Sequence, residues 1–281
     1  MPVKSLSSAL PKISFLMRPR RCAHKDCRRN ALLTAISRKA AGISVQGEWF
    51  CGADCFETAM AGALAALHLS TRKEQPAYRN RVPLGLTLVA RGDLSRYQLE
   101  IALDQHRATG VRLGDVIQYL GFASEEQVTS AVAAQWGHPV FPLRTAAETP
   151  VHIPARLLEL NRMLPVHCVR ASKRLLIGFA DGVDYRVLDA IRQVLCYAPS
   201  PCIIAASEYR RRLETIMEQT RGKEIVFDNE SNPQEMAQIL RSYAVQINAE
   251  EMRYAACCNH LWTRLKGRRH EMDILFRLPH E

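Results

Sequence analysis

The pattern of apolar residues and glycines occurs twice in the middle of the chain. The stretches 83–106 and 112–135 align at a fixed offset, so that glycines and apolar side chains of one copy fall on those of the other. The matched positions are Leu84 and Leu113, Gly85 and Gly114, Gly92 and Gly121, Leu99 and Val128, Ala102 and Ala131, and Leu103 and Val132. Shared glycines with shared apolar positions between them indicate a duplicated structural unit.

Each copy has the pattern of two helices. Apolar residues recur at helical spacing after the first glycine, and the second glycine, Gly92 or Gly121, suits a left-handed helix end. Ser95 and Ser124 then stand where an N-cap is expected, and Ser124 with Gln127 has the spacing of a capping box. We therefore predict a short helix, a turn and a long amphipathic helix in each copy, with the two copies packed together.

The stretch after the repeat, residues 146–221, has the pattern of a small α/β unit. A helix from Pro154 precedes two strand-like runs, PVHCVRA and LLIGFA, which a short polar turn separates. Asp184 is placed to cap a helix that ends near Leu195, and Ser207 is placed to open another after the strand-like PCIIAA. The expected order is strand, strand, helix, strand, helix.

The two ends of the chain carry shorter patterns. Between Gly42 and Gly47 lies a strand-like run, and an Ala- and Leu-rich helix follows Cys55. Residues 222–281 begin with the strand-like EIVF and continue as a helix from Pro233, with a break, to about Ala256. Alternating apolar residues then predict two strands around a turn at Gly267.

Together these patterns predict an α+β multidomain protein. The expected units are a disordered tail (1–17), a small four-cysteine zinc module with a helix (18–70), a linker (71–82), tandem helical-hairpin repeats (83–145), an α/β subdomain (146–221) and a C-terminal α/β piece with a β-hairpin (222–281).

Composition and charge narrow the class of protein. The 281 residues are 47% hydrophobic and 23% charged, which is typical of a soluble globular chain. The formal net charge is +10, and nearly all of the excess lies before residue 83. No apolar run is long enough to span a bilayer or to form a signal peptide, so we expect a cytoplasmic protein. The sequence has no GxxxxGK[ST], GxSxG or HExxH motif, and we expect no enzymatic activity.

Four cysteines have the spacing of a metal site. The first pair is Cys22 and Cys27, and the second is Cys51 and Cys55. Each pair is close enough in sequence to lie on one turn, and 23 residues separate the two pairs. Four thiolates of this kind form the tetrahedral site that structural zinc prefers, with no position left for catalysis. The alternative is four buried or redox-active thiols. Cys257 and Cys258 with His260 could form a second metal corner, but buried thiols at a strand end are the better interpretation.

Basic residues surround the first cysteine pair. They are Arg18, Arg20, Arg21, Lys25, Arg28 and Arg29. Such a patch can bind nucleic acid or acidic phospholipid. It can equally be a solvated face that offsets the negative charge of the four thiolates. Because no aromatic residues are interleaved with the basic ones, nucleic-acid binding is the weaker interpretation.

The repeat resembles a known family. The pattern RLGxxLxxxG, followed by an apolar helix that ends in Gln, is similar to the MshEN domain. This domain is the N-terminal region of type II secretion (general secretory pathway protein E) and type IV pilus assembly ATPases. The following stretch, with IPARLLELNRMLPV and LLIGFADGVDYRVLDAIRQVL, resembles the subdomain that comes next in that family. The resemblance covers about residues 82–220 and leaves out the ATPase motif, the four-cysteine module and the last 60 residues.

The resemblance implies a binding site for cyclic di-GMP. Arginine can contact a phosphate or stack on guanine, glycine allows close backbone approach, leucine lies beneath a purine, and glutamine can bond a base edge. The positions so implied are Leu84, Gly85, Gly92, Arg112, Leu113, Gly114, Gly121 and Gln135. The first copy departs from the pattern, with Pro83 in place of Arg and His106 in place of Gln, although Arg81 and Gln105 are close by. The same glycines and leucines are also what a tight helical hairpin needs to fold.

The leading functional hypothesis is a regulatory or adaptor protein, linked to secretion or pilus components and responsive to cyclic di-GMP. One alternative is a zinc-containing scaffold with a degenerate nucleotide site that acts through protein–protein contacts. Another is a nucleic-acid-binding regulator that uses the basic zinc module.

Overall fold

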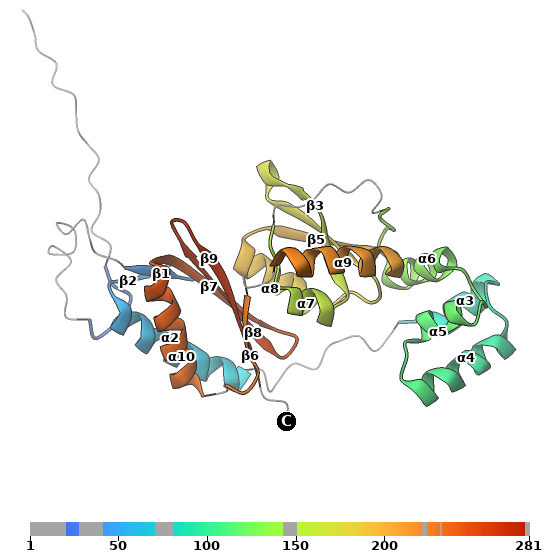
Figure 1. Cartoon of the computed structure of the whole chain (residues 1–281), viewed down its shortest axis with the longest axis horizontal. Helices are drawn as coiled ribbons and strands as arrows, with labels where there is room; N and C mark the ends of the chain where they lie inside the picture. The colour runs from blue at the N-terminus through green and yellow to red at the C-terminus, as the bar shows by residue number, and fades with distance from the viewer. Residues whose placement is uncertain are drawn as a thin grey trace, which may run out of the picture.

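The structure is a computed structural model that describes residues 21–27, 42–70, 81–142, 151–220, 224–230 and 232–278. The predicted tail (1–17) and most of the predicted linker (71–82) lie outside these residues. Within them the chain is a mixed α+β protein, as predicted, and its strands form two sheets (Figure 1). Among the described helices, none combines the length and the apolar character needed to cross a membrane.

The duplicated stretch folds into four helices, which pair across the two copies. The helices are α3 (Leu84–Arg91), α4 (Arg96–Thr109), α5 (Leu113–Tyr119) and α6 (Glu125–Trp136). The short helix of each copy packs against the long helix of the other, α3 on α6 and α5 on α4. Leu88, Ile117 and Ala131 are fully buried between them. The two copies therefore share one core, because a single two-helix unit has too little apolar surface to form its own.

The turns of the two copies have the same hydrogen bonds. Ser95 and Ser124 both accept a bond from the backbone N–H three residues on, and the glutamines there, Gln98 and Gln127, bond back to complete a capping box. The sequence predicted this box in the second copy only. Gly92 and Gly121 end the short helices with φ of 79° and 68°, in the left-handed region that favours glycine.

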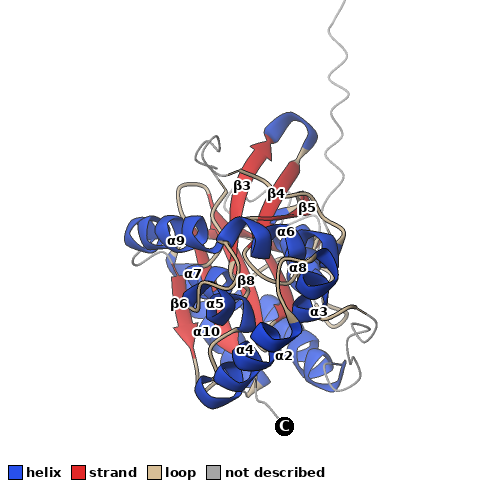
Figure 2. Cartoon of the chain, turned by 90° about the vertical axis from the view of Figure 1, so that its right-hand side faces the viewer, coloured by secondary structure: helices blue, strands red, loops and turns tan. Residues whose placement is uncertain are grey.

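The α/β unit has the predicted order of elements around a three-stranded sheet. Strand β4 (Arg174–Phe179) lies in the middle, antiparallel to β3 (Met163–Val169) and parallel to β5 (Ala198–Ile203). Figure 2 shows these strands together, with helices on either side. The helices are α7 (Ala155–Leu160), α8 (Tyr185–Leu195) and α9 (Ala206–Thr220). Asp184 caps α8 by accepting the Arg186 backbone N–H at 2.8 Å.

The two ends of the described chain meet in a six-stranded sheet. The strands are β1 (Ile43–Val45), β2 (Glu48–Phe50), β6 (Glu224–Phe227), β7 (Ala249–Cys257), β8 (His260–Gly267) and β9 (Glu271–Arg277), in the order β2-β1-β7-β8-β9-β6. Helices α2 (Ala53–Ser70) and α10 (Pro233–Gln246) pack against each other beside this sheet (Figure 1). The sequence assigned residues 18–70 and 222–281 to separate units, whereas in the structure they contribute to one sheet and one core.

The prediction of a helix from Pro233 to about Ala256 is wrong in its second half. Helix α10 ends at Gln246, and Asn248, with φ of 50°, takes the chain out of the helix into strand β7. The residues of β7 have no strong strand propensity. They form a strand because β1 and β8 supply hydrogen-bond partners on both sides, and tertiary context of this kind overrides local preference.

A continuous core joins the α/β unit to the six-stranded sheet, and His152 of the α/β unit contacts a buried ion pair of that sheet. The largest apolar cluster runs from Val132 in α6 through the three-stranded sheet to Trp262 in β8. Asp273 is 2% exposed and accepts bonds from Arg264 Nη2 at 2.6 Å and from Trp262 Nε1 at 2.8 Å. Burial is the largest influence and would raise the pKa of Asp273, but the charge of Arg264 and the hydrogen bonds from His152, Arg264 and Trp262 together outweigh it, so that the pKa is lowered. His152 Nδ1, just before α7, contacts the same carboxylate at 2.9 Å.

Candidate functional site

The four predicted cysteine ligands lie on two neighbouring turns. Cys22 and Cys27 flank a turn over residues 21–27, which is held to β2 by a bond from Ala23 N–H to Trp49 O at 2.8 Å. Cys51 directly follows β2, and Cys55 lies in the first turn of α2. The strand end and the helix start thus present one pair of thiols, and the 21–27 turn folds over them with the other.

The four thiols converge on one point. Their sulfur atoms all lie within 4.8 Å of one another, with Cys27 Sγ 3.5 Å and Cys55 Sγ 3.8 Å from Cys51 Sγ. A tetrahedral zinc with bonds of about 2.3 Å places its sulfur ligands about 3.8 Å apart. The observed separations bracket this value, so the donor set and its spacing fit zinc.

The electrostatics of the cluster also suit a cation. Burial raises the pKa of both Cys51 and Cys55, so without a metal these thiols keep their protons. A divalent cation reverses this preference by binding thiolates directly. The positive end of α2 at Cys55 and the Cys51 backbone N–H, 3.5 Å from Cys22 Sγ, stabilise the negative sulfurs further.

The weaker alternative of a second metal site at Cys257, Cys258 and His260 finds no support in the described residues. In the part of the chain that the structure describes, no second group of three or more Cys, His, Asp or Glu side chains comes together in this way. Cys258 Sγ instead contacts Asn161 Oδ1 at 3.1 Å, and His260 Nδ1 contacts the Cys258 carbonyl at 2.8 Å. Of the basic patch around Cys22, Arg21 and Lys25 are described, and Arg18, Arg20, Arg28 and Arg29 lie outside the described residues.

The glycines and leucines predicted to bind a nucleotide have structural roles in the repeat. A side-chain carbon at Gly85 would lie 2.4 Å from Leu99 Cδ1, and one at Gly114 would lie 3.2 Å from Val128 Cγ1. Gly92 and Gly121 are the left-handed helix ends described above, and Leu84 and Leu113 pack against the shared core. These residues bring the helices close together, whether or not a ligand binds.

Gln135 makes a bond that its counterpart in the other copy also makes. Gln135 Nε2 donates to the carbonyl of Val82, just before α3, at 2.7 Å. His106 is the matched residue of the first copy, and its Nδ1 contacts the carbonyl of Val111, just before α5, at 2.5 Å. Val82 and Val111 are themselves matched positions. The residue at the end of each long helix therefore holds the start of the other copy, and no motif in the sequence indicates this partner.

Arg112 is in an ion-pair network with the α/β unit. Its guanidinium pairs with Asp181, in the loop between β4 and α8. Arg162 contacts the same carboxylate at 3.4 Å and pairs with Asp115 at 3.0 Å. Burial lowers the pKa of Arg112, with the charge of Arg162 as a second cause, although the group stays protonated.

Two further residues reach the same loop. Trp136, at the end of α6, lies against the backbone of Gly182, where a side-chain carbon would be 2.5 Å from the indole. Arg81 stacks on the same indole, with its guanidinium carbon 3.6 Å from the ring centroid. Three guanidinium groups and one indole therefore gather around residues 181–182, a combination suited to phosphate and to a flat base. Trp136 directly follows Gln135 of the repeat motif, and this adjacency is the feature of the sequence that could have indicated Trp136 as a site residue.

Comparison with known proteins connects this region to solved structures. No family model matches the chain, and no curated protein matches it. A structure of MshE with cdg (cyclic di-GMP) is 30% identical, covers 48% of this chain and 99% of that chain, and has a TM-score of 0.40. The N-terminal domain of XpsE is 25% identical in two crystal forms, covers 50% of this chain, and has TM-scores of 0.38 and 0.30. The resemblance predicted from the repeat is thus confirmed for about half of the chain.

Proposed function

From the similarity of about half this chain to MshE and to the N-terminal domain of XpsE, we propose a non-enzymatic regulatory or adaptor protein. It works with components of type II secretion or of type IV pili, and its repeat binds cyclic di-GMP. One observation carries the proposal, namely the cluster of Arg81, Arg112, Arg162 and Trp136 around residues 181–182. Guanidinium groups bind phosphate and stack on guanine, and an indole ring is a good stacking partner for a base.

Ligand binding would act on the contact between the repeat and the α/β unit. The Arg112–Asp181 pair is partly open to solvent, with 53% and 32% of the two side chains exposed. Such pairs stabilise a protein by about 1 kcal/mol or less, so a ligand phosphate can replace Asp181 at small cost. Arg112 would then leave Asp181, and the repeat would be held to the α/β unit by fewer bonds. A change of this kind can alter which surface a partner meets.

Calorimetric titration of the full chain with cyclic di-GMP tests this function. Wild type should release heat at a defined stoichiometry, and Arg112→Ala should weaken the affinity by about tenfold or more, since a charge-assisted contact is lost. Arg96→Ala is the matched control, because this exposed arginine on α4 lies outside the cluster. Absence of heat with folded wild type contradicts nucleotide binding, and equal weakening by Arg96→Ala contradicts the placement of Arg112 in the binding site.

A scaffold with a degenerate site is the second candidate, and two observations favour it. The Gln135 amide already donates a hydrogen bond to the Val82 carbonyl, and Pro83 provides no cation at the position matched to Arg112. If folded wild type gives no heat in the titration, this second function becomes the better interpretation.

We also propose that Cys22, Cys27, Cys51 and Cys55 hold one structural zinc ion. The zinc would stabilise the 21–27 turn on the end of β2 and the start of α2. Metal analysis of the purified chain should return about one zinc per chain, and Cys51→Ser should lose it and lower the melting temperature. Cys196→Ser is the control, since this thiol lies far along the sequence in the turn after α8. A folded wild-type protein without metal would disprove the assignment.

A further inference from the structure

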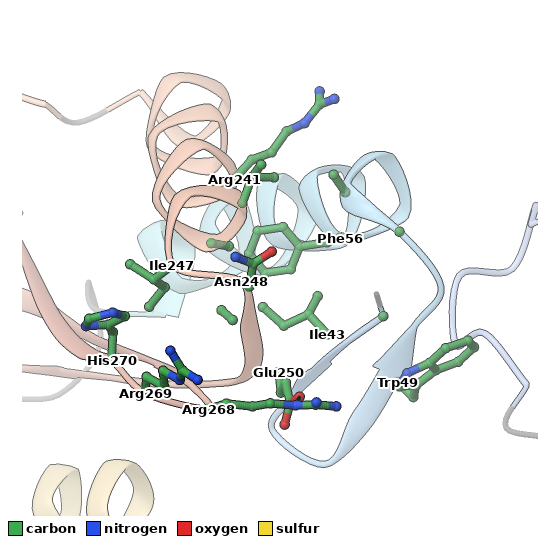
Figure 3. Close-up of a pocket in the computed structure, with 16 residues that line it drawn as sticks. Ile43, Trp49, Phe56, Arg241, Ile247, Asn248, Glu250, Arg268, Arg269 and His270 are labelled. Carbon is green, nitrogen blue, oxygen red and sulfur yellow. Dashed lines mark hydrogen bonds and ion pairs between the residues drawn. The ribbon is translucent and has the colours of Figure 1, made fainter. Parts of the chain in front are cut away.

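A cleft lies between the two ends of the described chain, next to the four-cysteine cluster. Its volume is about 790 Å³, within the range of roughly 300–1,000 Å³ that small-molecule sites occupy. One wall is formed by the start of α2 and the end of α10, and the other by β1 and the turn between β8 and β9 (Figure 3). The cleft is separate from the repeat and from the Arg112 network.

Small residues leave the space open, and apolar residues line its middle. Gly42, Gly52, Ala53, Ala244 and Ala249 contribute little or no side chain to the walls. At Gly42 the indole of Trp49 closes on the backbone, where a side-chain carbon would lie 2.4 Å from the ring. Figure 3 shows Ile43 and Phe56 facing each other in the middle, with Trp49 at one end and Arg269 and His270 toward the other.

The turn that carries the basic residues is held firmly in place. Gly267, at the end of β8, packs so tightly that a side-chain carbon there would lie 2.5 Å from the Ile247 carbonyl oxygen. The Gly267 N–H also donates to the His270 carbonyl at 2.8 Å. Arg269 therefore projects from a fixed turn and not from a long loop.

The charges at the cleft are mostly paired, and one cation is left over. Arg268 bonds Glu250 at 2.5 Å, which neutralises the single acidic residue of the lining. Arg241 pairs with Glu57 at 2.6 Å and with Asp54 at 2.9 Å. Arg269 makes no ion pair with any described residue. The cleft therefore has an apolar middle and an uncompensated positive charge at one end.

From this arrangement we infer that the cleft is a binding site for a small organic anion with a flat apolar body. The body lies along Ile43 and Ile247 toward Trp49, and the anionic group meets Arg269. An uncharged ligand would gain nothing from the exposed Arg269, and a compact inorganic anion would gain nothing from the apolar side chains of the lining. The site does not depend on nucleotide binding by the repeat.

Two fluorescent probes with the same kind of body test this site on the full chain. Anilinonaphthalene sulfonate has a flat apolar body and one negative charge, whereas N-phenyl-1-naphthylamine has a similar body and no charge. The sulfonate should bind with one molecule per chain and about tenfold tighter than the neutral probe. Energy transfer from tryptophan to the bound sulfonate should fall sharply in Trp49→Phe, because Trp49 lines the cleft.

Variants of Arg269 decide the outcome. Arg269→Ala should reduce sulfonate affinity to that of the neutral probe and leave the neutral probe unchanged, and Arg269→Lys should restore most of the loss. Arg277→Ala, which removes an exposed cation from the end of β9 outside the cleft, is the control. Sulfonate binding that is unaffected by Arg269→Ala, or energy transfer that is unaffected by Trp49→Phe, would overturn the proposal.

Discussion

The two copies of the repeat have the same backbone plan but different surroundings. Both have a capping box, a left-handed glycine and a side chain that holds the start of the other copy. Only the second copy contributes Arg112 and Asp115 to the ion pairs with the α/β unit. Its Glu125 also accepts bonds from Ser207 at the start of α9, at 2.7 Å. In the first copy, Pro83 and the half-exposed Leu86 occupy the positions matched to Arg112 and Asp115.

The comparison separates two kinds of residue in the motif. Residues that both copies keep are those that the four-helix core needs. Two residues of the second copy that differ from their matched positions, Arg112 against Pro83 and Asp115 against Leu86, contact the α/β unit, whereas their counterparts make no such ion pair. The substitutions in the first copy therefore reflect the lack of a docking partner and leave the fold of that copy intact.

The largest expected difference between the copies is at the tightly packed glycines. Gly85→Ala should destabilise the chain by about 1–2 kcal/mol, because the new carbon overlaps Leu99 in a closed core. Gly114→Ala should be nearly neutral, since its contact with Val128 is 3.2 Å and alanine favours the helix. Urea unfolding of both variants measures this difference. Equal losses would show that the two copies are packed alike.

The left-handed glycines should behave alike. Gly92→Ala and Gly121→Ala should each cost about 1 kcal/mol, because an alanine must adopt a positive φ at both positions. Thermal melting of the two variants side by side checks this expectation. A loss confined to one copy would mean that the two turns are not equivalent.

The smallest expected effects are at the matched ends of the long helices. His106→Gln should leave stability within about 0.5 kcal/mol of wild type, since glutamine makes the corresponding bond in the other copy. His106→Ala should lose about 0.5–1 kcal/mol, the net worth of an exposed hydrogen bond. Chemical denaturation detects both. If His106→Gln is as damaging as His106→Ala, the two ends are not interchangeable.

Local patterns in the sequence predicted the features that depend on near neighbours. The helices of the repeat, the left-handed glycines and the four-cysteine cluster are set by residues close together along the chain or by a metal-ligand spacing. The strand β7 was predicted as helix because its hydrogen-bond partners, β1 and β8, do not show in its own residues. The partners of Arg112 and Gln135 were missed for the same reason. Asp181 lies in another unit. The Val82 partner is a backbone carbonyl, which every residue has, so only the fold brings it to Gln135.

The joining of β1 to β7 has a consequence for biosynthesis. Gln46 Nε2 bonds the carbonyl of Tyr254 at 2.6 Å, across 208 positions of sequence. During translation β1 therefore cannot pair with β7 until some 208 further residues have been synthesised. Loops of this length close slowly, and unpaired strand edges are open to wrong partners meanwhile. The four thiols all precede Phe56, so a metal ion can bind them early and keep the nascent strands folded on their own turn until β7 arrives.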